Sequence, residues 1–487
     1  MPTTPTEASG RRWWILAIIG IAQLMVVLDA TIVNIALPSA QADLGFSDES
    51  RQWIITAYAL SFGSLLLLGG RLGDVFGRKR VFVTGLAGFA AASALGGFAD
   101  SLGVLVGARA LQGAFAALLA PAALSLLTTT FTVAEERNRA FSVFGVIGAS
   151  GAALGLILGG ALTELLDWRW TMFVNLALAV PTAVAALRLL SRDATAGDRA
   201  PIDLPGTLTA SSGLFALVYG FSNAESHGWG SALTIAGLAA GVALIGAFVA
   251  VERRVEHPLL PLRVIADGPR AGGFLSIAIV GAGMFGVFLF LTYYLQQTLG
   301  FSPLVSGLAF LPMMAVIMPV GAIGQTRLLP RVGPRPLVAG GMVLSAAAML
   351  LFTGVEVDSS YATAVLPGLL VLGVGLGLIF GTAMETATRG VEGTDAGVAS
   401  ALVNTGQQIG GSIGTALLST LAASAASSYA SSHRTVADVA AQSAVHGYAA
   451  AFTWAAAIFA AGSIAAWLLL PAAAPDAAPD REPVFAH

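Results

Sequence analysis

The chain has 487 residues, of which 56% are hydrophobic and 10% are charged, and its formal net charge is −3. Soluble proteins carry about 25% charged residues, so this composition indicates an integral membrane protein whose charges are confined to loops. The absence of cysteine excludes disulfides and thiolate metal sites. The five histidines fall in predicted loops or at chain ends, so neither a metal centre nor a cofactor is expected.

Apolar runs long enough to cross a membrane recur along the whole chain. A spanning helix needs about 20 apolar residues, and on this basis the sequence predicts fourteen spans. The first run contains Asp29 and is far longer than the apolar core of a signal peptide, so we interpret it as a retained span. The predicted spans are 13–38, 53–70, 81–99, 103–129, 140–162, 170–190, 205–223, 232–251, 271–294, 304–325, 337–354, 362–386, 397–422 and 447–470.

Basic residues concentrate in alternate loops. If the N-terminus is cytoplasmic, 20 of the 24 Lys and Arg residues fall in cytoplasmic loops or tails. The exceptions are Arg51, Arg169 and Arg434 in outer loops and Arg109 within a span. An excess of Lys and Arg marks cytoplasmic loops. The sequence therefore predicts that both termini are cytoplasmic.

An internal repeat divides the chain. Five positions around the turn after the second span recur at an offset of 256. They are Arg71, Leu72, Gly77, Lys79 and Gly85, which match Arg327, Leu328, Gly333, Arg335 and Gly341 in that order. The repeat predicts two six-helix halves with a substrate site at their interface near the middle of the bilayer. The predicted units are a cytoplasmic tail at 1–12, an N-terminal half at 13–192, a linker with two extra spans at 193–265, a C-terminal half at 266–470 and a disordered cytoplasmic tail at 471–487.

The turn after the second span has the sequence Gly-Arg-Leu-Gly-Asp-Val-Phe-Gly-Arg-Lys-Arg at 70–80. Glycine permits a tight turn, and the basic cluster indicates a cytoplasmic loop; a hairpin that only sets topology is one reading. The spacing resembles the signature loop between helices 2 and 3 of the major facilitator superfamily of transporters. That resemblance implies that Asp74 clamps one conformation by contacting the start of the thirteenth span. The implied conformational-switch loop comprises Gly70, Asp74, Gly77, Arg78 and Lys79.

The first span carries an acid in the stretch Leu-Asp-Ala-Thr-Ile-Val-Asn-Ile-Ala-Leu-Pro at 28–38. A charge inside a span costs about 2.5–3.5 kcal/mol on insertion scales, so Asp29 must be retained for a reason. The stretch resembles the first-helix motif of the fourteen-helix drug:proton antiporters within the same superfamily. Asp29 is either a proton or cation site or a structural partner of an arginine or a helix dipole.

The fourth span carries Arg109 and Gln112 in a pattern that resembles the family motif with a membrane-embedded arginine, which is linked to proton coupling. A structural ion pair is the alternative. At 1.5 Å per residue, Asp29 and Arg109 lie roughly 13 and 9 Å below the outer ends of their helices, so their side chains are expected to meet.

The fifth span contains glycines at intervals of three and four, which place most of them along one stripe. The stripe resembles the antiporter motif of exporters, except that Leu156 stands where that motif has proline, and generic glycine packing is the alternative. The motif glycines are Gly151, Gly155, Gly159 and Gly160.

Polar and aromatic residues on other spans are candidates to line a central cavity, with interhelical packing as the alternative role. These are Asn34, Gln112, Tyr293, Tyr294, Asn404 and Gln408. Glu385, near the cytoplasmic end of the twelfth span, is a further candidate for proton coupling, although a loop-edge acid that faces water is the simpler and favoured explanation.

The fold class expected from these features is an all-α polytopic membrane protein with the major facilitator fold. The resemblance implies a monomeric proton-coupled antiporter, not an enzyme, that exports hydrophobic and often cationic drugs or antibiotics across a bacterial inner membrane by alternating access. Its partners would be drug-like molecules, protons and the bilayer, with no nucleic acid. An uptake symporter is the main alternative. An ATP-driven pump lacks support because the only lysine, Lys79, is followed by Arg80 and no phosphate-binding loop exists, and no soluble domain supports a membrane enzyme or sensor.

Overall fold

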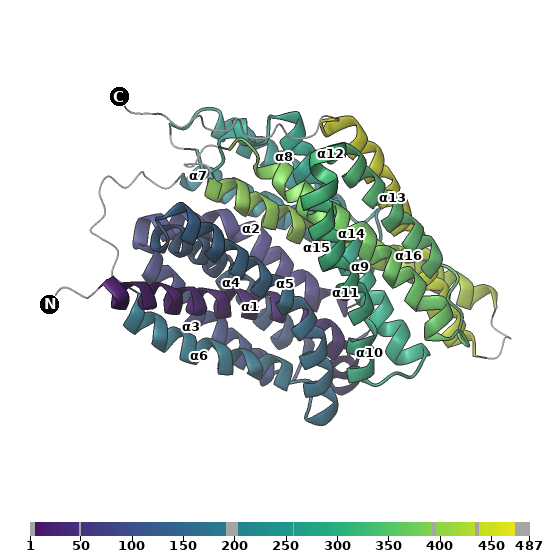
Figure 1. Ribbon diagram of the computed structural model, residues 1–487. Helices are drawn as coiled ribbons and strands as arrows, with labels where there is room; N and C mark the ends of the chain where they lie inside the picture. The colour runs from purple at the N-terminus through teal and green to yellow at the C-terminus, as the bar shows by residue number, and fades with distance from the viewer. Residues whose placement is uncertain are drawn as a thin grey trace.

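The computed structural model describes residues 5–47, 50–190, 203–256, 258–391, 396–433 and 438–472. All regular structure in these ranges is helical, as the composition predicts. Twelve helices in the described residues are long and apolar enough to cross a membrane. Figure 1 shows them as two adjoining bundles, one purple to blue and the other green to yellow.

The first bundle contains six long helices. They are α1 (Pro5–Leu44), α2 (Gln52–Phe76), α3 (Arg78–Gly97), α4 (Leu102–Thr130), α5 (Ala134–Leu165) and α6 (Trp170–Leu189). Helix α1 packs against α5 and α6, and α4 packs against α2 and α3. Since α1 begins at Pro5, it includes much of the predicted N-terminal tail.

Two helices follow, α7 (Leu204–His227) and α8 (Ala232–Glu252), and they pack chiefly against each other. Helix α7 also contacts α2 and α15. The predicted linker before α7 lies partly outside the described residues.

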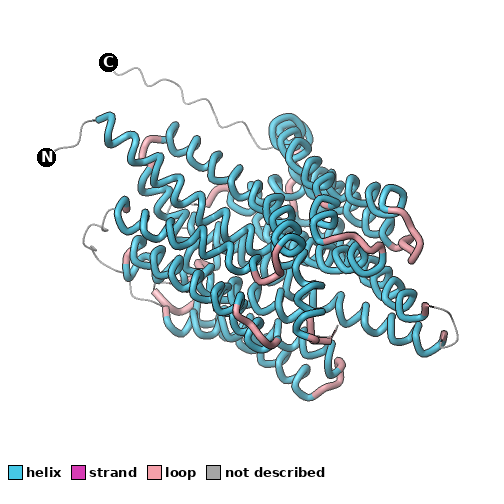
Figure 2. The backbone as a smooth tube through the Cα atoms, turned by 90° about the horizontal axis from the view of Figure 1, so that it is seen from below, coloured by secondary structure: helices cyan, strands magenta, loops and turns pink. Residues whose placement is uncertain are grey.

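The second bundle is more interrupted than the first. Its α-helices are α9 (Gly268–Tyr293), α10 (Pro303–Ala309), α11 (Leu311–Ile323), α12 (Leu329–Val332), α13 (Pro334–Phe352), α14 (Leu366–Thr388), α15 (Ala396–Ser432) and α16 (Val439–Leu469). Segments η2 (Tyr294–Thr298), η3 (Gly324–Leu328) and η4 (Tyr361–Val365) are π-helical, and η1 (Leu262–Val264) is a 3₁₀ turn. Figure 2 shows that short loops join most of these helices.

Local sequence explains several helix starts. Asp203, Asp267 and Ser302 each precede a helix with proline in its first turn. Their side chains accept hydrogen bonds from backbone N–H groups three residues on, at 2.8, 3.1 and 3.4 Å. These residue types satisfy the free N–H groups at a helix start, where proline costs no hydrogen bond.

The twelve spans of the described chain fall short of the fourteen predicted. Helix α7 is not among the twelve, since Ser211, Ser212, Ser222 and Asn223 dilute its apolar character. Helix α2 contributes only the shorter apolar stretch Gln52–Leu66. Both nevertheless run alongside the other helices, α2 against α4 and α7 against α8. The predicted outer loop between the last two spans is shorter than expected, because α15 continues to Ser432.

Candidate functional site

Asp29 of α1 and Arg109 of α4 form an ion pair inside the first bundle. Arg109 Nη1 donates to Asp29 Oδ2 at 2.5 Å, and the side chains of Arg109 and Asp29 are 2% and 0% exposed. Their contact agrees with the depths read from the sequence. A charged side chain within a membrane span needs a partner of opposite charge. Asp29 and Arg109 are such partners for each other.

Two amides complete the coordination of the Asp29 carboxylate. Gln112 Nε2 and Asn175 Nδ2 donate to Asp29 Oδ1 at 3.0 and 2.7 Å. The same two nitrogens also donate to Ser93 Oγ, at 2.6 and 3.1 Å. Asp29, Ser93, Gln112 and Asn175 are all fully buried, and their direct hydrogen bonds join α1, α3, α4 and α6.

Helix α2 holds the other side of the arginine. Arg109 Nε donates to the backbone oxygen of Ile54 at 3.3 Å. The guanidinium carbon lies 4.3 Å from the Tyr58 ring centre, in cation–π geometry. Arg109 Nη1 also donates to Gln112 Oε1 at 2.9 Å. The arginine is therefore fixed by a carboxylate, an amide, a carbonyl and an aromatic face.

Sequence reasoning identified Asp29, Arg109 and Gln112 but not Ser93, Asn175 or Tyr58 as members of this network. Asn175 ends the stretch Trp-Arg-Trp-Thr-Met-Phe-Val-Asn at 168–175, where a lone amide in an apolar run was the available signal. Ser93 offered none, because a serine in a helix commonly bonds to its own backbone.

The glycines of α5 pack on protein and not on lipid. A Cβ added at Gly151, Gly155 or Gly159 would lie 3.3, 2.9 or 2.8 Å from a backbone oxygen of α1. At Gly160 a Cβ would instead lie 2.5 Å from Leu304 Cα, at the start of α10. The stripe thus allows α5 to approach two helices, one from each bundle.

The remaining cavity candidates do not gather around Asp29. Tyr293 and Tyr294 point toward the ends of the helices, where their hydroxyls donate to Gln41 Oε1 at 2.6 Å and to the Glu356 backbone oxygen at 2.8 Å. Gln41 lies about 18 Å along α1 from Asp29, so these tyrosine hydroxyls lie well away from the ion pair, and their role in a cavity stays a prediction.

Three amides have separate surroundings. Asn34 Nδ2 donates to Ala30 O of its own helix at 3.0 Å, and its buried Oδ1 has no partner. Gln408 is buried on α15, where its Cβ would lie 3.2 Å from a Cβ added at Gly63 of α2. Asn404 is half-buried one turn earlier on α15.

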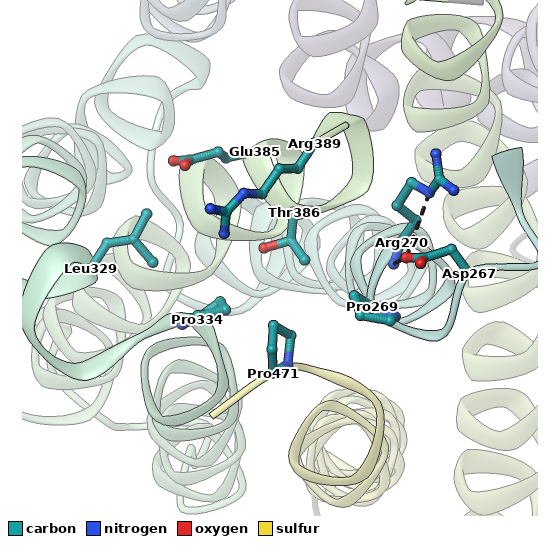
Figure 3. Close-up of a pocket in the computed structure, with 9 residues that line it drawn as sticks. All are labelled: Asp267, Pro269, Arg270, Leu329, Pro334, Glu385, Thr386, Arg389 and Pro471. Atoms are coloured by element: carbon teal, nitrogen blue, oxygen red, sulfur yellow. Dashed lines mark hydrogen bonds and ion pairs between the residues drawn. The ribbon is translucent and has the colours of Figure 1, made fainter. Parts of the chain in front are cut away.

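Glu385 lies far from the ion pair, at the rim of a surface pocket. The pocket is lined by Asp267, Pro269, Arg270, Leu329, Pro334, Glu385, Thr386, Arg389 and Pro471 (Figure 3). The Glu385 side chain is exposed. This position favours the simpler reading of Glu385 as an acid that faces water.

The turn between α2 and α3 is a single residue, Gly77, with φ of 94°. Its repeat partner Gly333 joins α12 to α13 with φ of 76°. Only glycine adopts such angles readily, so both copies need it. The Asp74 side chain and residues 392–395, which precede α15, lie outside the described residues, so the contact expected between Asp74 and that helix start is not observed either way.

The two bundles pack against each other through α2 and α15, and hydrogen bonds also join them near the end of α1. Besides the bond from Tyr293 to Gln41, Gln296 Nε2 donates to Ile35 O at 2.9 Å, and the backbone N–H of Leu304 donates to Glu164 Oε2 at 3.0 Å. We call these three hydrogen bonds the end clasp. It lies at the end of the molecule that the charge pattern predicts to face outward.

The model of the Major Facilitator Superfamily matches residues 19–415. The chain belongs to this superfamily. It is 50% identical to a puromycin resistance protein of Streptomyces alboniger over 94% of this chain and 92% of that protein. It is 40% identical to a cephamycin export protein of Amycolatopsis lactamdurans (80% and 81% covered) and 32% identical to a multidrug efflux pump of Mycolicibacterium smegmatis (84% and 80% covered).

Solved structures agree on the fold. A peptide transporter of the POT family superimposes with a TM-score of 0.68 at 18% identity, covering 94% of this chain and 96% of that one. A bacterial homologue of the lysosomal transporter Spinster gives 0.67 at 15% identity, covering 96% and 98%. The superfamily membership identifies the chain as a multi-pass membrane transporter.

Proposed function

We propose that this protein exports antibiotic-like molecules from a bacterial cell in exchange for protons, and that Asp29 carries the proton. The observation that supports this most is the buried Asp29–Arg109 pair in a chain whose relatives are named for drug resistance and export. The proton gradient supplies the energy, so no cofactor is required. The protein acts as a monomer in the inner membrane with both termini cytoplasmic.

The substrate class follows from the relatives. Puromycin and cephamycin differ widely in structure, and the relatives named for them span most of this chain. A hydrophobic, often cationic, drug-like molecule is the class that such a transporter would accept, within a site between the two bundles.

Asp29 has the chemistry that proton coupling needs. As an anion it accepts hydrogen bonds from Arg109, Gln112 and Asn175. A proton on Asp29 would remove the attraction for the guanidinium and free Arg109 to move. Because a buried charge without a partner is costly, protonation and rearrangement of these helices would occur together.

The end clasp supports a cycle of alternating access. In the described conformation it joins the bundles on the predicted outer side, through three hydrogen bonds and the Gly160 contact. Release of a drug outward would require these contacts to break while the bundles rock against each other. The fourteen-span arrangement of two six-helix halves plus α7 and α8 belongs to the same proposal.

The test is drug or dye transport in inside-out membrane vesicles with an imposed pH gradient. We expect gradient-dependent movement of a cationic dye by the wild type and none by Asp29→Asn. The matched control is Asp100→Asn, an exposed acid in the loop before α4, which should transport normally. Unimpaired transport by Asp29→Asn would remove Asp29 from the mechanism and leave Glu385 to be tested. Proton-driven movement in the opposite direction would support the uptake symporter.

A further inference from the structure

Two acidic side chains meet at the base of the α7–α8 pair, away from the ion pair and the end clasp. Asp203 precedes α7, and its Oδ1 accepts a hydrogen bond from the Gly206 backbone N–H at 2.8 Å. Glu252 ends α8, and its Oε2 accepts from the Leu260 backbone N–H at 2.9 Å. The residues are 6% and 5% exposed. Each carboxyl group thus has one satisfied oxygen in a buried setting.

The other two oxygens face each other. Asp203 Oδ2 and Glu252 Oε1 are buried and have no hydrogen-bond donor. A Cβ added to Gly206 would lie 2.5 Å from Glu252 Oε1 and closer still to Asp203 Oδ2, so both oxygens reach the same point. The two carboxyl groups are within hydrogen-bonding reach of each other. Two carboxylates in this arrangement would repel, and each would leave a buried oxygen unpaired.

No basic side chain in the described part of the chain forms an ion pair with Asp203 or Glu252. Three nearby arginines are exposed: Arg253, Arg254 and Arg263. The nearby acid Glu256 is exposed as well. Arg270 bonds to Asp267 and to the Arg263 backbone oxygen. The facing start of α15, residues 396–402, carries no charged side chain. His257 lies outside the described residues.

We propose that Asp203 and Glu252 bind one proton between them, so that Glu252 Oε1–H donates to Asp203 Oδ2. The proton comes from the solvent, and no covalent bond changes. It belongs on Glu252 because the C-terminal end of α8 disfavours a negative charge there, whereas Asp203 already accepts a hydrogen bond from the start of α7. One proton therefore satisfies both orphan oxygens and removes the repulsion.

The shared proton fixes the segment that leads into the second bundle. Glu252 holds Leu260, which is buried in a cluster with Ala210 of α7, Phe248 of α8 and Ala399 of α15. Loss of the proton would push Glu252 away from Asp203 and disturb this cluster. The site is a second proton-binding site of the protein, and it does not depend on the proposed transport function.

The experiment is infrared difference spectroscopy of the full-length protein in lipid nanodiscs as the pH is raised from mildly acidic to alkaline. We expect a protonated-carboxyl C=O band that disappears at alkaline pH in the wild type. Glu252→Gln should lack the band, because the amide donates to Asp203 without titrating. Glu256→Gln, an exposed acid four positions on, should keep it.

Thermal unfolding gives a second readout that does not depend on band assignment. The folded pair binds a proton that two exposed carboxylates of the unfolded chain have already released, so wild-type stability should fall as the pH rises. Glu252→Gln should lose this dependence and Glu256→Gln should retain it. An unchanged band and pH profile in Glu252→Gln would overturn the proposal. Stabilisation of the wild type, but not of Glu252→Gln, by sodium or a divalent cation would also overturn it, since the site would then hold a metal ion.

Discussion

Lys79 and Arg335 make the same contact at equivalent places in the two bundles. Lys79 Nζ donates to the backbone oxygen of Leu190, just past α6, at 2.5 Å, and Arg335 Nε donates to that of Leu470, just past α16, at 2.8 Å. Each basic residue is the second residue of the helix that follows a positive-φ glycine, and each caps the last helix of its bundle. The sequence repeat is therefore also a repeat of contacts.

This contact predicts the effect of removing the lysine. Lys79→Ala loses bonds to the Leu187 and Leu190 carbonyls, which lie at the negative end of α6. Because the site is partly exposed, we expect a loss of about 0.3–1 kcal/mol, measured as a lower thermal unfolding temperature in detergent. Lys79→Arg should restore most of it. An unchanged unfolding temperature in Lys79→Ala would show that α6 ends without this support.

The buried ion pair predicts a larger penalty. Arg109→Ala leaves Asp29 buried without its cation and should destabilise the protein by about 3–5 kcal/mol. Arg109→Lys should not restore transport, because a single ammonium cannot reach Asp29, Gln112 and the Ile54 carbonyl together. The check is a double-mutant cycle with Asp29→Asn in thermal unfolding. Additive effects of the two substitutions would mean that the pair carries no coupling energy.

Asn175 tests the amide support of Asp29. Asn175→Ala removes a hydrogen bond to a buried carboxylate, worth about 1.5–3 kcal/mol, and we expect both lower stability and weaker gradient-driven dye transport. Thr182→Ala is the control on the same helix, since Thr182 bonds only to the Leu178 carbonyl of α6. Equal transport by both variants would assign Asn175 a packing role alone.

The glycines of α5 predict two separable defects. Gly159→Leu should abolish export while the protein still inserts, because α1 leaves no room for a side chain. Gly160→Ala should weaken the contact with the start of α10 and favour opening of the end clasp. Gly145→Ala, where a Cβ meets nothing within 4 Å, is the control. The readouts are dye transport and membrane yield, and normal export by Gly159→Leu would contradict the packing described here.

Tyr293 predicts how the clasp responds to loss of one bond. Tyr293→Phe keeps the ring under Arg51, 4.0 Å from its guanidinium carbon, but loses the hydrogen bond to Gln41. Since the chain contains no cysteine, a single cysteine placed at Ala36 reports access directly. We expect faster labelling by a membrane-impermeant maleimide in the Tyr293→Phe background than with Tyr293 intact. Equal rates would show that this bond does not hold the clasp closed.

The sequence predicted most reliably what depends on rare residues. A lone arginine within a span demanded a partner, and Asp29 was at a matching depth, so their meeting could be inferred. The partners of Tyr293 and Tyr294 could not be predicted, because helical position alone does not tell which end of a neighbouring helix a long side chain reaches. The Asp203–Glu252 pair was missed because it depends on the approach of two helix ends and a distant segment, which no local pattern encodes.

In the proposed cycle, a proton on Asp29 would act through the hydrogen bonds that surround this carboxylate. Through Ser93, Arg109, Gln112, Asn175 and the Ile54 carbonyl, the carboxylate is hydrogen-bonded into one network that links five helices of the first bundle. The second bundle instead contains the three π-helical segments of the described chain, where the regular backbone ladder is broken and bending is cheapest. Under the proposed proton coupling, the first bundle would keep its arrangement until Asp29 is neutralised, and the second bundle, with its interrupted helices, would take up the deformation that follows.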